Sequence, residues 1–230
     1  LSCCRAEVPR GLGSVHVAAQ KSLCYADFHP MRARVRPSTA IVAAALLGVL
    51  PATATDFRGR VELLEKGKPS ADKTLAVDAT VVVFTPTRPV PAPKAVTVDM
   101  VTVRKAFLPR LLVVPVGSTV RFPNQDPILH NVFSVSGRNS FDLGLLGKGA
   151  GKSALFREAG IVRVFCNVHH GMFGYVFVVA SPYWARIGAD GTFSIAGVPA
   201  GAGKLTVWNE RSSPTTMDLT LPLAVPPKIG

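Results

Sequence analysis

Prolines and glycines interrupt this sequence so frequently that the chain is restricted to short extended elements. The 230 residues include 19 prolines and 20 glycines, and four of the prolines lie between Thr85 and Lys94. Proline lacks a backbone donor and fixes φ, so it ends helices and central strands. Runs of β-branched residues lie between these breaks, for example DATVVVF at 78–84. The pattern predicts an all-β protein.

Short strands are expected on both sides of the proline-rich segment, which we interpret as a linker or an extended crossing. The pattern predicts strands at 57–64, 78–84, 96–108, 111–116, 118–122, 131–135, 154–156, 161–165, 175–179, 185–187, 192–195 and 204–208. The glycine-rich segment 138–152 is expected to be a long loop, and Asp190-Gly191 is expected to be a hairpin turn. Many short strands separated by turn signals are typical of a β-sandwich.

A segment near the amino terminus has the three parts of a secretory signal peptide. It begins at Met31, continues with arginines at 32, 34 and 36, and then has an apolar stretch at 41–50. The sequence Ala-Thr-Ala at 52–54 is a small-residue cleavage pattern. We expect residues 31–54 to direct export to the periplasm, with cleavage after Ala54. The alternatives are an uncleaved anchor or a core helix, but the stretch is short for a membrane span.

Cleavage after Ala54 would change both the charge and the cysteine count. We interpret residues 1–30 as an upstream or spurious leader, with a genuine extension as the alternative. Residues 1–54 contain six basic and two acidic residues, so the remainder carries a net charge of +8 instead of +12. Its basic residues are scattered and not interleaved with aromatic residues, so nucleic-acid binding is not expected. A mild preference for acidic partners is expected, and no stable membrane insertion after cleavage.

Cys166 would be the single cysteine after cleavage, and it lies in the sequence Cys-x₂-His-x₂-Met. Side chains alternate along a strand, so Cys166 shares an inward face with Val162 and Val164. A short loop then returns His169 and Met172 toward the thiol. His130, at an upstream loop-to-strand junction, would supply a second imidazole.

One thiolate, two imidazoles and a weak thioether form the ligand set of a blue copper site. We therefore predict that His130, Cys166, His169 and Met172 bind one copper ion. His170 is the less favoured alternative to His169, because its spacing from Cys166 fits the loop less well.

The stretch from Phe107 to Val179 resembles the cupredoxins, the plastocyanin and amicyanin group. The residues that carry the resemblance are VVPVGSTVRF at 113–122, HNV at 130–132 and CNVHHGM at 166–172. The resemblance implies a Greek-key β-sandwich and the same four ligands, and it implies that Asn131 braces the ligand loop through hydrogen bonds. It also implies an electron path through His169, with an apolar surface patch. The patch is expected to comprise Pro127, Ile128, Leu129, Met172 and Phe173.

The flanking segments resemble a second, smaller β-sandwich of the transthyretin-like or carboxypeptidase-regulatory-like type. The resemblance rests on 57–84 and on ADGTFSIAGVPAGAGKLTVW at 189–208. We predict a discontinuous accessory sandwich at 55–98 and 182–224, with the copper domain at 99–181 inserted in it. The alternative is one enlarged sandwich. Composite chains of this type resemble those called methylamine-utilisation or plastocyanin-like proteins.

These features favour an exported carrier of single electrons, with a dehydrogenase or a c-type cytochrome as partner. The alternative is a protein for copper binding and delivery, or a partner-binding β-sandwich without a redox role. We do not expect an enzyme, because Cys166 and His169 have no marked third residue to orient a nucleophile and its base. Further histidine-rich motifs, which a multicopper oxidase needs, are absent from the sequence.

Overall fold

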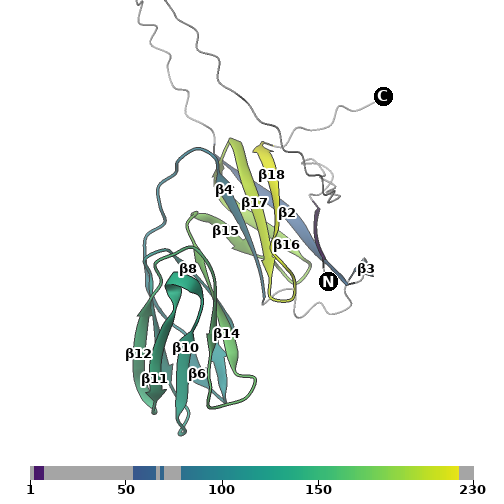
Figure 1. Ribbon diagram of the computed structural model, residues 1–230. Helices are drawn as coiled ribbons and strands as arrows, with labels where there is room; N and C mark the ends of the chain where they lie inside the picture. The colour runs from purple at the N-terminus through teal and green to yellow at the C-terminus, as the bar shows by residue number, and fades with distance from the viewer. Residues whose placement is uncertain (1–2, 8–53, 66–67, 70–78, 223–230) are drawn as a thin grey trace, which may run out of the picture.

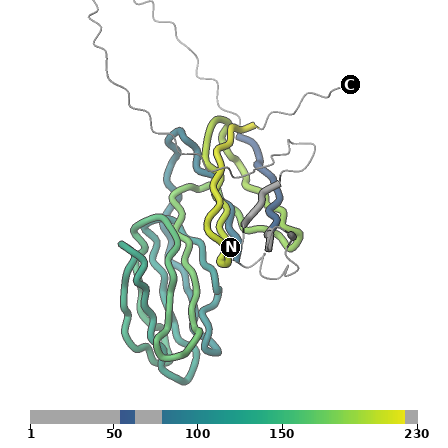
Figure 2. The backbone as a smooth tube through the Cα atoms, turned by 45° about the vertical axis from the view of Figure 1, so that its right-hand side comes forward, coloured from purple at the N-terminus to yellow at the C-terminus, as the bar shows by residue number. Residues whose placement is uncertain are grey.

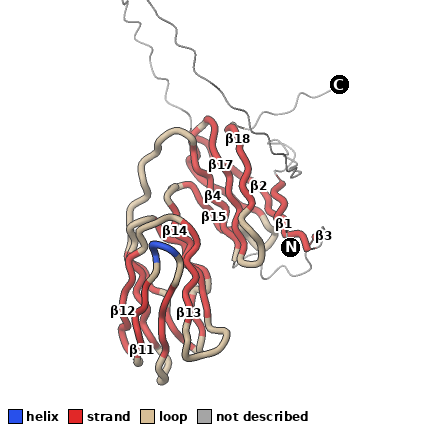
Figure 3. The backbone as a smooth tube through the Cα atoms, in the orientation of Figure 1, coloured by secondary structure: helices blue, strands red, loops and turns tan. Residues whose placement is uncertain are grey.

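The computed structural model describes residues 3–7, 54–65, 68–69 and 79–222 (Figure 1). Within these ranges the protein is built almost entirely of strands, as predicted, and its one helical element is the short 3₁₀ helix η1, Gly137–Asn139 (Figure 3). Apart from Ala54, the predicted signal peptide lies outside the described residues, and only Cys3–Glu7 of the predicted leader is described. Both of these segments remain predictions.

Two sheets form a first β-sandwich, which we call the host sandwich. One sheet has the order β1-β2-β16 with β3 also paired to β2, and the other has the order β15-β4-β17-β18. The strands are β1 (Cys3–Glu7), β2 (Ala54–Glu65), β3 (Lys68–Pro69), β4 (Thr80–Pro86), β15 (Tyr183–Arg186), β16 (Thr192–Pro199), β17 (Gly201–Asn209) and β18 (Thr215–Leu221). Its core includes a cluster of three phenylalanines, Phe57, Phe84 and Phe193.

Two further sheets form a second sandwich, which we call the inserted sandwich. One sheet has the order β11-β10-β13-β14-β8, and the other has the order β12-β9-β6-β7 with β5 also paired to β9. The strands are β5 (Thr97–Asp99), β6 (Val101–Val103), β7 (Ala106–Leu108), β8 (Leu111–Pro115), β9 (Thr119–Asn124), β10 (His130–Ser134), β11 (Phe141–Leu146), β12 (Gly149–Leu155), β13 (Gly160–Phe165) and β14 (Phe173–Val179). Met100, Phe107, Phe122 and Phe156 are fully buried between the sheets.

The inserted sandwich is connected to the host sandwich between two neighbouring host strands, and both connecting segments can be followed in Figure 2. Strand β4 leads into it, and β15 follows it. These two strands are antiparallel partners, with Phe84 opposite Tyr183. The Ser181 hydroxyl donates a hydrogen bond of 2.5 Å to the Phe84 carbonyl. The entrance and exit of the insertion therefore lie side by side.

A third apolar cluster joins the two sandwiches. Val81 and Val83 of β4 and Trp208 of β17 pack against Tyr175 and Phe177 of β14. The Trp208 ring centre lies 5.2 Å from that of Tyr175 and 5.8 Å from that of Phe177. Strand β4 is thus buried on both faces, which explains its continuous run of apolar residues.

The structure corrects two expectations drawn from the sequence. Segment 138–152, predicted as a long loop, contains strand β11 and the first part of strand β12. Its glycines supply the positive φ angles that the bends in these strands require, as at Gly144 and Gly151. Asp190-Gly191 is a turn but not that of a hairpin, because β15 and β16 belong to different sheets. Strand β18 was not predicted.

Candidate metal centre

Strand β13 places Cys166 at one end of the inserted sandwich. Val162 and Val164 are buried in the core while Arg163 is exposed, so Cys166 continues the inward-facing side of the strand. Its thiol is buried and is not in a disulfide. The alternation predicted from the sequence is confirmed here.

The loop from Cys166 to Met172 folds back on itself through its own backbone. The Cys166 N–H donates to the Met172 carbonyl at 3.1 Å, and the Met172 N–H donates to the His169 carbonyl at 3.3 Å. Gly171 has a φ of +73°, a conformation that glycine adopts without the steric cost of a Cβ. This compact loop brings the His169 ring back beside the Cys166 thiol.

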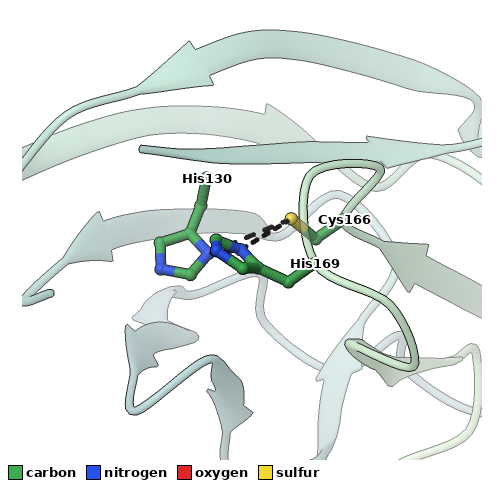
Figure 4. Close-up of side chains that lie close together, drawn as sticks. All are labelled: His130, Cys166 and His169. Carbon is green, nitrogen blue, oxygen red and sulfur yellow. Dashed lines mark hydrogen bonds between the residues drawn. The ribbon is translucent and has the colours of Figure 1, made fainter. Parts of the chain in front are cut away.

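The structure brings three of the predicted ligands together, as Figure 4 shows. The Cys166 Sγ lies 3.9 Å from His130 Nδ1 and 3.8 Å from His169 Nδ1, and the two Nδ1 atoms are 3.1 Å apart. The three candidate ligand atoms all lie within 4.8 Å of one another. His130 begins β10, the strand beside β13, so neighbouring strands and one loop build the cluster.

Met172 and Asn131 also lie in this region, as the sequence placed them. Met172 is buried in the core of the inserted sandwich. The Asn131 amide donates to the Asp142 carboxylate at 2.9 Å and to the Gly144 carbonyl at 3.2 Å, so its hydrogen bonds go to β11. The roles of both residues at a metal remain predictions.

Asp126 lies beside the cluster and was not predicted from the sequence. Its Oδ2 lies 2.9 Å from His130 Nε2, on the opposite side of the ring from the thiol. Hydrogen bonds from the Lys105 and Arg104 N–H groups, together with the His130 ring, lower the pKa of Asp126. The signal available in the sequence was an aspartate four residues before a candidate ligand.

The electrostatic environment favours a neutral imidazole at His169. Burial lowers the pKa of its ring, and the electrostatic interactions with His130 and Lys105 lower it further, against an opposing effect of Asp126. A neutral imidazole has a lone pair that can bind a metal. A buried thiol with two imidazoles is a donor set that suits a soft or borderline transition metal, and copper is among these.

Comparison with solved structures finds cupredoxins and a copper enzyme. A purple cupredoxin from Nitrosopumilus maritimus is 25% identical, with 37% of this chain and 100% of that chain covered and a TM-score of 0.32. A reduced mutant of amicyanin is 30% identical, with 39% and 86% covered and a TM-score of 0.33. A copper-containing nitrite reductase from Thermus scotoductus is 29% identical, with 41% and 24% covered and a TM-score of 0.34. No family model and no curated protein sequence matches the chain.

The fold and the site together define a β-sandwich that carries a His₂Cys cluster at one end. The cluster is formed by a short loop between β13 and β14 and by a histidine at the start of β10. This is the architecture of the cupredoxins, and the chain contains a cupredoxin domain within a longer polypeptide. In the part of the chain that the structure describes, no helix is long and apolar enough to span a membrane.

Proposed function

We propose that this protein is an exported type 1 copper protein that carries single electrons between redox partners in the periplasm. The observation that supports the proposal most directly is the convergence of His130 Nδ1, His169 Nδ1 and Cys166 Sγ within 4.8 Å. One bound copper ion would supply the chemistry, which is the exchange of one electron between Cu(I) and Cu(II). The protein would hold the donor atoms in place while the charge changes.

Each proposed ligand is held by structure outside the cluster. Cys166 is fixed at the end of a central strand, and His130 is fully buried at the start of the neighbouring strand. The two backbone hydrogen bonds of the 166–172 loop restrain His169 and Met172. The Met172 thioether would be a fourth and weaker donor to the ion. Donors restrained in this way lower the reorganisation that each electron transfer requires.

Partners would dock at the end of the inserted sandwich that holds the cluster. Ile128, Leu129, Leu145 and Val168 are exposed apolar residues there. Leu129 Cδ2 lies 3.8 Å from the place that a Cβ on Gly147 would occupy, and Leu145 lies opposite Asn131 in the β10–β11 pair. Of the patch expected from sequence, Met172 is instead buried and Phe173 lies beneath the Arg110 guanidinium, 4.3 Å from its ring centre. Leu145 and Val168 take their place in the patch.

The charges around this patch favour an acidic partner, which could be a c-type cytochrome or a dehydrogenase. Arg104, Lys105 and Lys148 are exposed around it, whereas the nearby Asp126 is buried and bound to His130. We expect the double variant Lys105→Glu with Lys148→Glu to slow electron transfer to an acidic c-type cytochrome at low salt. The matched control, Arg138→Glu with Arg157→Glu, changes the same charge away from the cluster.

The decisive experiment is a visible spectrum of the full chain after addition of Cu(II). An intense thiolate-to-copper band is expected, and Cys166→Ser should abolish it. His169→Ala should abolish or strongly shift the band, whereas His170→Ala, a change of the exposed neighbour, should leave it in place. A reversible one-electron wave in voltammetry would then support the role as a carrier.

Three results would contradict parts of this proposal. Absence of the band in the folded protein would exclude the type 1 site. Rapid loss of copper to a chelator, without a reversible wave, would favour copper delivery instead. Because one structural neighbour is a nitrite reductase, nitrite is the substrate to test, and its steady turnover would contradict a pure carrier.

A further inference from the structure

A carboxylate lies directly behind the buried His130 ring. His130 Nε2 is 2.9 Å from Asp126 Oδ2, while His130 Nδ1 faces the Cys166 thiol and the His169 ring. An ionised carboxylate can only accept hydrogen bonds, so the ring nitrogen that faces it carries the proton. In a neutral imidazole this leaves the Nδ1 lone pair directed into the cluster.

Asp126 is itself held in place by backbone groups from another part of the chain. Its Oδ1 accepts from the Arg104 N–H at 2.7 Å, and its Oδ2 accepts from the Lys105 N–H at 2.9 Å. Both donors have a positive φ, 52° and 58°, which residues other than glycine adopt infrequently and which tends to occur at functional sites. The Asp126 N–H also donates to Asn124 Oδ1 at 2.9 Å. The carboxylate is therefore fixed in position and direction.

We propose that Asp126 is a positioning residue that makes Nδ1 the metal-binding nitrogen of His130 and that stabilises the oxidised form of the bound copper. This inference rests on the proposed copper site. Outer partners of ligating histidines fix their tautomer and raise their basicity. A fixed negative charge also attracts Cu(II) more strongly than Cu(I), so Asp126 shifts the equilibrium toward the oxidised state.

The first test is Asp126→Asn in the full chain, with Asp99→Asn as the matched control. Asparagine has the same shape and can still accept a hydrogen bond, but it lacks the charge. Asp99 is a partly exposed carboxylate of the same sandwich, paired with Arg121 at 2.6 Å on β9. In a spectroscopic redox titration, Asp126→Asn should raise the Cu(I)/Cu(II) ratio at a given potential by about tenfold, which corresponds to about 59 mV for one electron. If Asp126→Asn changes this ratio no more than Asp99→Asn does, the proposal that Asp126 stabilises the oxidised copper is wrong.

The second test needs no metal and keeps the inference separate from the proposed function. Nitrogen-15 NMR of the metal-free full chain reports which ring nitrogen of His130 is protonated. The native protein should show Nε2–H, and Asp126→Ala should populate Nδ1–H, while Asp126→Asn should retain the native tautomer. An unchanged tautomer in Asp126→Ala would contradict the positioning role. The visible spectrum in turn tests the copper site independently of this result.

Discussion

At the scale of single residues, the candidate site combines candidate ligands, which the sequence indicates, with supporting residues, which it does not. Cys166, His169 and His130 could be predicted because a chain cleaved after Ala54 has one cysteine and three histidines, all near one motif. Asp126 could not be predicted, because its importance comes from the backbone of Arg104 and Lys105, more than 20 residues away. Contacts of this kind depend on how strands pair.

Asn124 supports the loop that precedes His130. Its side chain donates to the carbonyls of Ile128 at 2.9 Å and Leu146 at 3.0 Å, and it accepts from the Asp126 N–H. Asn124→Ala should cost about 2–3 kcal/mol of stability, because buried backbone groups lose their partners. It should also shift the copper spectrum, since it loosens the loop that holds Asp126.

The matched variant is Asn139→Ala. Asn139 is also buried, and its side chain makes three hydrogen bonds with the backbone of Arg157 and Glu158. It should lose similar stability in urea unfolding but leave the spectrum unchanged. A spectral shift of equal size in both variants would show that the effect of Asn124 is not local to the site.

Asp142 predicts a pH dependence of stability. The Gly144 N–H and the Asn131 amide lower the pKa of its carboxyl in the folded protein. A lowered pKa gives stabilisation that is present above the unfolded-state value of about 3.9 and is lost as pH falls through the folded-state value. Asp142→Asn should therefore be less stable at neutral pH and should lose less stability on acidification. Urea unfolding of the metal-free native protein and the variant, at neutral pH and at a pH below the folded-state pKa, measures this difference. Equal losses of stability in the two proteins on acidification would contradict the prediction.

At the scale of elements, the sequence predicted strands where apolar runs alternate and failed where glycines set the geometry. The 161–165 and 175–179 segments were recognised from their apolar pattern and are central strands. Segment 138–152 was misinterpreted, because glycine occurs both in loops and in bent strands at a sheet edge. Only the three-dimensional pairing of β12 with β9 distinguishes the two.

Substitution of Gly151 tests whether a glycine is required where β12 bends against β9. It has a φ of +68°, and a Cβ there would overlap the Phe122 carbonyl of β9. Gly137 has a φ of +50° but no atom within 4 Å of such a Cβ. Gly137→Ala should cost about 1–2 kcal/mol from the backbone conformation alone. Gly151→Ala should cost clearly more in chemical unfolding, and equal losses would refute the steric argument.

At the scale of the whole molecule, a buried interface joins the two sandwiches. Beside the apolar cluster around Trp208, Arg110 of the inserted sandwich donates to Glu210 of the host at 3.0 Å. The Arg186 guanidinium of β15 also donates to the Leu111 carbonyl of β8. These contacts restrain the sandwich that carries the cluster on the surface of the host.

Trp208→Ala tests how strongly the sandwiches stabilise each other. Removal of a buried tryptophan should cost about 3–5 kcal/mol. Because the side chain lies between the two units, the native protein should unfold in one calorimetric transition and the variant in two. One transition at a lower temperature would show that the connections at β4 and β15, and not this interface, couple the units.

The position of the insertion between β4 and β15 has a mechanical consequence. The two strands are paired neighbours, so the inserted sandwich stands where a host hairpin would have its turn. A pull on the two ends of the chain is carried by the hydrogen-bonded host strands and does not stretch the insertion until β4 and β15 separate. The pairing of β4 with β15 therefore shields the inserted sandwich, and the cluster within it, from tension along the chain.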